Sequence, residues 1–274
     1  MKKNGLSIFQ NEFVQIRKDV RYDTCNEKGT EILTKRVIPV MLLSNNRLVR
    51  TIKFSQIIDI GNPVSQAKIF SAQDVDEIIF LDITGDSNMR GILEKVSDEC
   101  FFPITAGGGI KTVEQIRELL NAGADMVILN SEVYKRPSLV GDAAKAFGSQ
   151  CVLVCIDYLF NEVRFNRGVT PSLVSPLTWA ESMEFYGAGE IVLHPIERDG
   201  TMQGFDLKTL EEIANKVKIP VVAMGGCGNL QHIVDAFNVG ASAVAISSMF
   251  AFTDISPIKA KSFLKNSGVL VREI

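Results

Sequence analysis

Short apolar runs recur along the chain from residue 36 onward, separated by segments of mixed polarity. The runs are continuous rather than alternating with polar residues, which is typical of parallel strands buried on both faces. We predict eight such strands, which read RVIPVMLL, EIIFLDI, PITA, MVILN, CVLVCID, EIVLH, IPVVAM and SAVAIS. Buried strands that alternate with helices indicate an α/β protein.

Residues that start and stop helices stand between these runs. Asn62 is a cap with Pro63 at the first helical position, and Thr112 with Gln115 three residues later forms a capping box. Gly123 is suited to end that helix. Further helices are predicted over 137–147, 176–186 and 206–216, after Asn229, and from Ser256.

The chain contains an internal repeat. Residues 101–131 resemble residues 218–248, and EIIFLDITGD resembles EIVLHPIERD. Two related sets of four strands fit a single (β/α)8 TIM barrel built from two duplicated half-barrels. An open, doubly wound sheet is the alternative, but it does not explain the duplication. The matching positions are Pro103 and Pro220, Gly108 and Gly225, Gly123 and Gly240, and Ser131 and Ser248.

We assign residues 35–274 to the barrel and residues 1–34 to an N-terminal extension. The extension is polar and lacks periodicity, so it is either an added hairpin or a loosely ordered arm, and both remain open. Its first residues are too polar for the apolar core of a secretory signal. No apolar run approaches the roughly 20 residues of a membrane helix.

Composition narrows the class of partner and the compartment. The chain has 274 residues, 46% of them hydrophobic, which is enough for one well-buried core. A net charge of −3 offers no basic surface for nucleic acid or a membrane. The five cysteines are scattered without metal-ligand spacing, so we expect reduced thiols in a cytoplasmic protein. We expect no cofactor and no bound metal.

Glycine-rich turns follow the third and seventh predicted strands. Barrel chemistry lies at the carboxyl ends of strands, where glycines let a phosphate approach free backbone N–H groups. A single turn of this kind could be only a tight connection. Because it occurs twice, each time followed one strand later by Asn-Ser or Ser-Ser, we predict two phosphate sites. They comprise Gly109, Asn130 and Ser131 in the first half, and Gly200, Gly226, Ser247 and Ser248 in the second.

Ionisable residues stand at other strand ends. Asp157 ends the fifth strand, where it could act as general acid or base, or only cap a helix or pair with a loop. Asp82 and Asp199 end the second and sixth, and Asp199 could orient a phosphate or hydroxyl group. His194 lies in the sixth strand without a cysteine or aspartate partner at metal-ligand spacing, so we expect no metal there. His232 is expected at the surface.

Several motifs together carry a family resemblance: KRVIP, DEIIFLDIT, GGGIKTVEQIRELLNAGAD, ILNS, FGSQCVLVCID, YGAGEIVL, ERDGTMQGFDL and GG-x-GNL. Over roughly residues 34–274 the chain resembles the cyclase subunit of imidazole glycerol phosphate synthase, the HisF family. That family makes a nitrogen-containing ring from ammonia, which a HisH-like glutaminase docked under the barrel supplies through its bore. The resemblance implies a phosphorylated small-molecule ligand and a catalytic Asp157.

One position departs from the family. Its first strand ends in a catalytic aspartate, in a motif like I-P-C-L-D, whereas Leu42 stands here and cannot exchange a proton. The lysine that follows becomes Arg50, a candidate for substrate binding. Losing a general acid or base typically costs about 10²–10⁴ in rate, so we expect weak or absent cyclase turnover. Residues 42–54 look more like HisF-like proteins that work with a glutaminase and a third amidotransferase, associated with acetamidino groups on surface-polysaccharide sugars.

The resemblance also marks a ring of residues at the strand starts, here called the ammonia gate. It comprises Arg36, Glu77, Met126 and Glu190. Met126 replaces a lysine of the family, so two acids face one base. We expect a less fully paired ring and a looser gate.

Three functions follow. The first is an amidotransferase subunit that passes ammonia from a glutaminase toward amidino-sugar synthesis. The second is an active cyclase subunit of histidine biosynthesis, and the third is a non-catalytic regulatory or scaffold barrel.

Overall fold

A computed structural model describes residues 24–25, 31–32 and 34–272. Eight parallel strands close into a barrel, because β14 pairs with β3 and β8 pairs with β9. The predicted barrel is confirmed. Its strands are β3 (Arg36–Ser44), β6 (Ile78–Asp82), β7 (Ile104–Gly107), β8 (Met126–Leu129), β9 (Val152–Leu159), β12 (Glu190–Pro195), β13 (Val221–Met224) and β14 (Ala243–Ile246).

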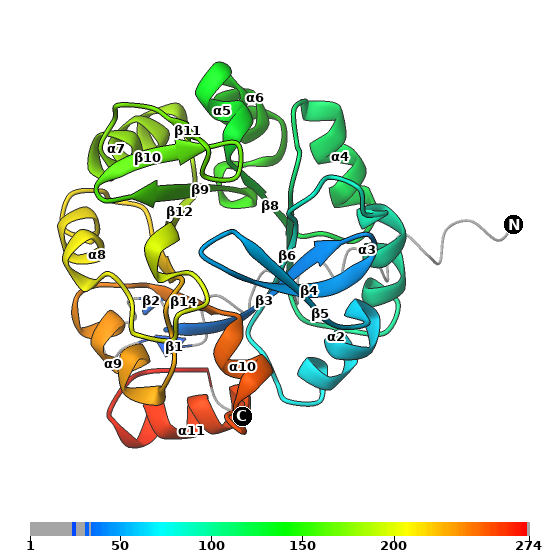
Figure 1. Ribbon diagram of the computed structural model, residues 1–274, viewed down its shortest axis with the longest axis vertical. Helices are drawn as coiled ribbons and strands as arrows, with labels where there is room; N and C mark the ends of the chain where they lie inside the picture. Colours follow the sequence, from blue (N-terminus) through cyan, green and yellow to red (C-terminus); the bar gives the residue numbers. More distant parts are fainter. Residues whose placement is uncertain (1–23, 26–30, 33, 273–274) are drawn as a thin grey trace, which may run out of the picture.

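Helices surround the strands on the outside (Figure 1). They are α2 (Pro63–Ser71), α3 (Met89–Ser97), α4 (Val113–Asn121), α6 (Ser138–Phe147), α7 (Pro176–Tyr186), α8 (Leu207–Ala214), α9 (Leu230–Asn238) and α11 (Pro257–Asn266). Short helices α5 (Ser131–Lys135) and α10 (Ser248–Phe252) follow β8 and β14.

The predicted caps are confirmed by their hydrogen bonds. Asn62 accepts from the backbone of Ser65, and Thr112 accepts from that of Gln115. The Gln115 side chain accepts from Lys111, one residue before the cap, rather than from the cap itself. Helix α3 was not predicted, although Met89, Ile92, Leu93 and Val96 bury one face at helical spacing.

Two antiparallel hairpins extend beyond the barrel, and neither was predicted. Strand β3 continues into β4 (Arg47–Ile52) and β5 (Gln56–Gly61). Strand β9 continues into β10 (Glu162–Phe165), which pairs with β11 (Thr170–Pro171). Each half-barrel therefore begins with a strand that runs past the rim. At the first hairpin turn Asn45 and Asn46 have φ of 48° and 62°, the left-handed conformation that asparagine tolerates.

Apolar side chains fill the barrel, and a second layer packs between strands and helices. Along β3, Ile38, Val40 and Leu42 belong to the interior cluster, whereas Met41 and Leu43 pack with residues of α2 and α3. This period of two places alternate residues on opposite faces. Leu42 is therefore aimed into the barrel at its carboxyl end.

The N-terminal extension is described only in part. Strand β1 (Thr24–Cys25) pairs antiparallel with β2 (Glu31–Ile32), and the remainder of 1–33 lies outside the described residues. Lys35 bridges to Val271 beside the barrel. Among the described helices none has both the length and the apolar character needed to cross a bilayer. Cys100, Cys151, Cys155 and Cys227 are free thiols, as expected for these four.

Candidate active site

A small pocket lies at the carboxyl ends of β3, β12, β13 and β14. Its volume is about 20 Å³, roughly the space of one water molecule. It brings together Leu42, His194 and Asp199 with the glycines and serines of the second predicted phosphate site. The lining residues from that site are Gly200, Gly226, Ser247 and Ser248.

Glycine is required in the second turn. Gly226 has φ of +99°, and a Cβ there would lie 2.2 Å from the carbonyl oxygen of Gly204. A hydrogen bond also keeps the two glycines close together: Gly204 N–H donates to the Gly226 carbonyl at 2.7 Å. Ser247 Oγ is buried and has no hydrogen-bond partner among the described residues. An anion in this pocket would supply that missing acceptor.

The first turn is built differently. Gly109 has φ of +68° and open space around it. The Asn130 amide donates to Asp157 Oδ2 at 2.7 Å, and Ser131 Oγ accepts from the backbone of Asn166 at 2.9 Å. Both side chains are therefore engaged within the protein, and the two halves are not equivalent as anion sites.

Asp157 is the centre of a buried hydrogen-bond network. Its side chain accepts from Asn130, and its Oδ1 lies 3.2 Å from His194 Nδ1 and 3.5 Å from the Cys155 thiol. The register explains the contact, because His194 on β12 is the direct partner of Asp157 on β9. Asp157 is thus neither a helix cap nor a partner for a loop cation.

Two carboxylates flank the His194 ring. Its Nε2 lies 3.5 Å from Asp199 Oδ1 and makes no hydrogen bond within the described structure. Burial alone would lower the pKa of His194, but its interactions with Asp157, Asp199 and Cys155 raise it well above the ordinary value of 6.5. Burial likewise opposes ionisation of Asp199, yet His194, Thr51 and the Phe54 N–H lower the pKa of Asp199. The two carboxylates therefore favour the protonated form of the ring.

The sequence predicted that His194 has no cysteine or aspartate partner suited to bind a metal, and this prediction is wrong. Cys155, Asp157 and His194 place their donor atoms within 4.8 Å of one another, because strand pairing brings β9 beside β12. Cys155 and Asp157 are two apart in one strand and face the same side. Burial raises the pKa of the Cys155 thiol to about 12, so this sulfur is a neutral thiol. The three groups satisfy one another through their mutual contacts, and we assign no metal to them.

Arg50 lies deep beside the pocket, only 2% exposed. Burial lowers the pKa of Arg50 to about 10, and the nearby charge of Asp199 partly offsets this. Its Nη1 donates to the Val49 carbonyl, and its Nε has no partner among the described residues. An incompletely paired buried guanidinium is suited to an anionic ligand.

The β4–β5 hairpin is tied across the mouth of the barrel (Figure 1). Thr51 Oγ1 donates to Asp199 Oδ2 at 2.8 Å, and Lys53 N–H donates to the Asp199 carbonyl at 3.0 Å. The ring of Phe54 lies 4.9 Å from that of His194. The hairpin is therefore held against His194 and Asp199, two residues that line the pocket.

At the opposite end, the residues predicted to form an ammonia gate share one cation, Arg36. Arg36 contacts both acids, Glu77 at 2.7 Å and Glu190 through its other terminal nitrogen. Burial alone would lower the pKa of Arg36, but the two carboxylates raise it above its ordinary value. Thr105 also donates to Glu77 at 2.6 Å. The ring is more fully paired than expected, although Glu190 Oε2 lacks a hydrogen-bond partner among the described residues.

Two other predicted residues serve the local structure. Asp82 accepts from the backbone N–H groups of Thr84, Gly85 and Ser87, and so shapes the loop after β6. His232 is half-buried on α9, where its Nδ1 accepts from Gly228 N–H.

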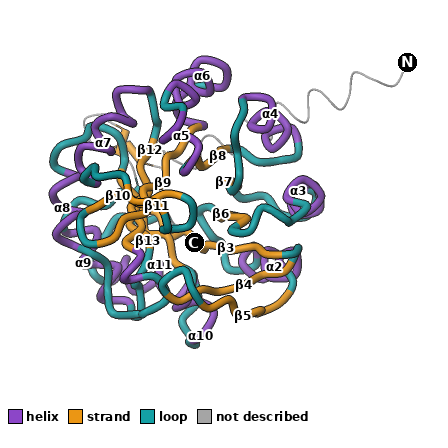
Figure 2. The backbone as a smooth tube through the Cα atoms, turned by 45° about the horizontal axis from the view of Figure 1, so that its top comes forward, coloured by secondary structure: helices purple, strands orange, loops and turns teal. Residues whose placement is uncertain are grey.

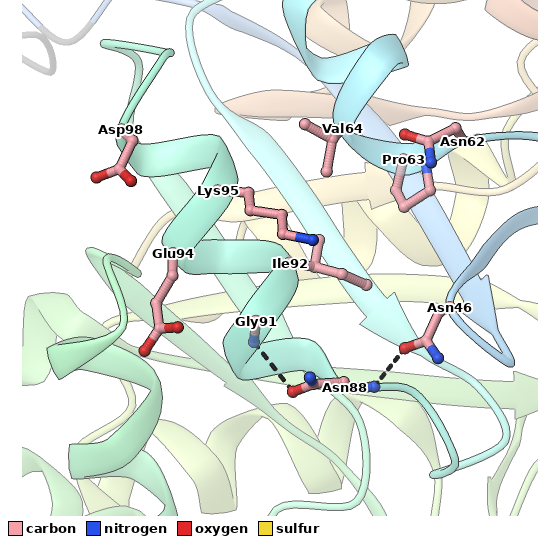
Figure 3. A pocket seen from close by; sticks show the side chains of 10 residues that line it. All are labelled: Asn46, Asn62, Pro63, Val64, Asn88, Gly91, Ile92, Glu94, Lys95 and Asp98. Carbon is pink, nitrogen blue, oxygen red and sulfur yellow. Dashed lines mark hydrogen bonds between the residues drawn. The ribbon is translucent and has the colours of Figure 1, made fainter.

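A larger groove of about 560 Å³ lies elsewhere, between α2 and α3 (Figure 3). At its end Asn46 accepts from the backbone of Asn88, whose side chain accepts from Gly91. It contains none of the site residues, and we assign it no chemistry.

Comparison with known proteins agrees with this architecture. Residues 36–256 match the family model described as histidine biosynthesis protein. The chain is 42% identical over 246 residues to imidazole glycerol phosphate synthase subunit HisF of Campylobacter concisus strain 13826. That alignment covers 87% of this chain and 98% of the relative. The chain belongs to the HisF family of histidine biosynthesis proteins.

Proposed function

We propose that the chain is a HisF-type subunit of a glutamine-dependent amidotransferase. It receives ammonia from a HisH-like glutaminase docked at the amino ends of the strands and passes it through the barrel to a phosphorylated acceptor at the carboxyl ends. The acceptor step belongs to acetamidino modification of a surface-polysaccharide sugar, with a third amidotransferase as a further partner. The protein acts in the cytoplasm.

The observation that carries this proposal is the apolar interior between the ammonia gate and the pocket. Ammonia is mostly protonated near neutral pH and escapes into water, so a subunit that uses it benefits from a closed, nonpolar route. A cluster of buried apolar side chains lies between the two ends. They include Ile38, Val40, Ile79, Val192, Val222, Met224, Ala243 and Ala245.

Leu42 favours this function over ordinary cyclisation. It lines the pocket where the family resemblance implies an aspartate, and it is 4% exposed among apolar neighbours. The site then has Asp157 but no second acid on β3.

A second candidate, the cyclase subunit of histidine biosynthesis, is favoured by the identity of 42% to a protein named as that subunit. An assay with the cyclase substrate and an ammonium salt separates the two. We expect turnover about 10²–10⁴-fold below that of a HisF cyclase that keeps the strand-one aspartate. Equal turnover would establish the second candidate.

Docking is tested with surface residues, because Glu77 and Glu190 are each only 1% exposed and their replacement would disturb the barrel. Phe101 precedes β7 at the amino ends of the strands and is 67% exposed. Phe160 lies in the β9–β10 turn at the opposite end and is 81% exposed.

In a pull-down and a glutamine-hydrolysis assay with a HisH-like glutaminase of the same organism, the wild type should bind and activate the partner. Phe101→Glu should weaken binding at least about tenfold, the effect of losing one well-packed aromatic contact. The matched variant Phe160→Glu should bind like the wild type. If no complex forms at micromolar concentration and glutamine hydrolysis is unchanged, the proposal is wrong and the scaffold function is favoured.

A further inference from the structure

The two half-barrels place different residues at equivalent points of the pocket. On the first and second strands of the first half, Leu42 on β3 pairs with Leu81 on β6. On the corresponding strands of the second half, Asp157 on β9 pairs with His194 on β12. One half therefore presents an apolar pair where the other presents an aspartate and a histidine.

The pocket has room for this histidine because its neighbours are shaped around it. A Cβ on Gly225 would lie 2.9 Å from His194 Cδ2, so only glycine leaves the ring its place. Asp157 orients the ring through Nδ1, and Phe54 of the hairpin packs against it. These contacts leave Nε2 buried without a hydrogen bond, in a ring that lines the same pocket as Leu42.

From this geometry we infer that His194 is the proton-transferring residue of the pocket, oriented by Asp157 and Asp199. This inference rests on the proposed function, in which ammonia reaches a phosphorylated acceptor here. Strand β3 contributes Leu42 to the pocket, which cannot titrate, and His194 supplies a titratable group instead.

The chemical step is addition of ammonia to a carbonyl carbon of the phosphorylated acceptor. A C–N bond forms as the π electrons of the C=O bond move to oxygen. The His194 imidazolium gives its Nε2 proton to that oxygen, and the neutral ring then takes one proton from the new ammonium group. The product is a carbinolamine, and the imidazolium is restored.

The charged and titratable groups that face His194 come from three neighbouring segments. Cys155 and Asp157 face it from β9, and Asp199 faces it from the loop after β12. Arg50 on β4 lies near Asp199 and is the only cation of this set. Two carboxylates next to the ring favour its protonated form, as a general acid requires.

The protonation state is measured directly by nitrogen-15 NMR of the imidazole rings. The chain has two histidines, so His232→Gln identifies the signals of His194. We expect His194 to be protonated on both nitrogens at pH 7, and its titration midpoint to fall in Asp157→Asn. A neutral ring at pH 7, or zinc retained by Cys155, Asp157 and His194 in the purified protein, would overturn the inference.

Turnover gives the second test, with the cyclase substrate and an ammonium salt. His194→Gln should lower kcat about 10²–10⁴-fold, with little change in KM, and should remove the limb of the pH profile that reports the histidine. His232→Gln should keep wild-type turnover. The inference is rejected if His194→Gln retains at least a third of wild-type kcat, or if the wild type shows no ammonia-dependent turnover. The proposed function is tested separately, by the assays of partner binding and glutamine hydrolysis.

Discussion

Single residues in this barrel are set by their strand neighbours more than by their own chemistry. His194 is an ordinary residue within an apolar run, yet pairing with β9 places it against Asp157, and a bend after β12 returns Asp199 to its other side. Asp199 follows His194 closely in sequence, but Asp157 is 37 residues away. Knowing that the fifth and sixth strands of a barrel are adjacent would have predicted the contact, because both residues lie near the ends of their strands.

The raised pKa of His194 has a consequence for stability at the residue scale. A group whose pKa is higher in the folded than in the unfolded state stabilises the fold fully below its unfolded pKa, near 6.5. That stabilisation is lost as the pH rises through the folded pKa. The wild type should therefore exceed His194→Gln in free energy of unfolding by more at pH 6 than at pH 9. Urea unfolding at both values is the measurement, and a difference independent of pH would contradict it.

At the scale of elements, local patterns predicted the regular parts well. The eight strands are continuous apolar runs and the helix caps are short motifs, so both could be read directly from the chain. The hairpins after β3 and β9 were missed because their outer strands are short and partly polar, and only the Asn45–Asn46 turn marked the first of them. The two glycine turns look alike in sequence but differ in what surrounds them.

The difference between the two turns is testable with one matched pair. In Gly109→Ala the added Cβ has open space around it. The free energy of unfolding should fall only by the cost of a left-handed backbone at alanine, roughly 1 kcal/mol. Gly226→Ala adds a clash with the Gly204 carbonyl and should cost at least about 3 kcal/mol, or shift the turn. Thermal unfolding compares their stabilities. Similar losses in the two variants would show that the second turn is no more constrained than the first.

Across the whole molecule, the charged gate and the ionisable pocket lie at opposite ends of one apolar interior. Figure 2, turned from the first view, shows the barrel strands surrounded by helices. Each end of this interior has a cluster of charged groups with buried partners. Each end depends on a central cation: without Arg36 or a protonated His194, two carboxylates would face each other.

This arrangement predicts the cost of removing the central cation. Arg36→Met leaves Glu77 and Glu190 buried and facing each other, which should lower the free energy of unfolding by about 3–5 kcal/mol. Arg47 pairs with Asp59 at 2.8 Å, but both side chains are half exposed. Arg47→Met should therefore unfold at nearly the wild-type urea concentration, and equal effects of the two variants would count against a buried charge cluster.

Arg36 also joins the two copies of the ancestral repeat. It comes from the first half, as does Glu77, whereas Glu190 comes from the second. If the chain were cut between α6 and β9, the first fragment would keep a balanced arginine–glutamate pair. The second would carry a glutamate with no counter-ion at the base of its open sheet. The second fragment is therefore the dependent one, and co-expression with the first should rescue its solubility.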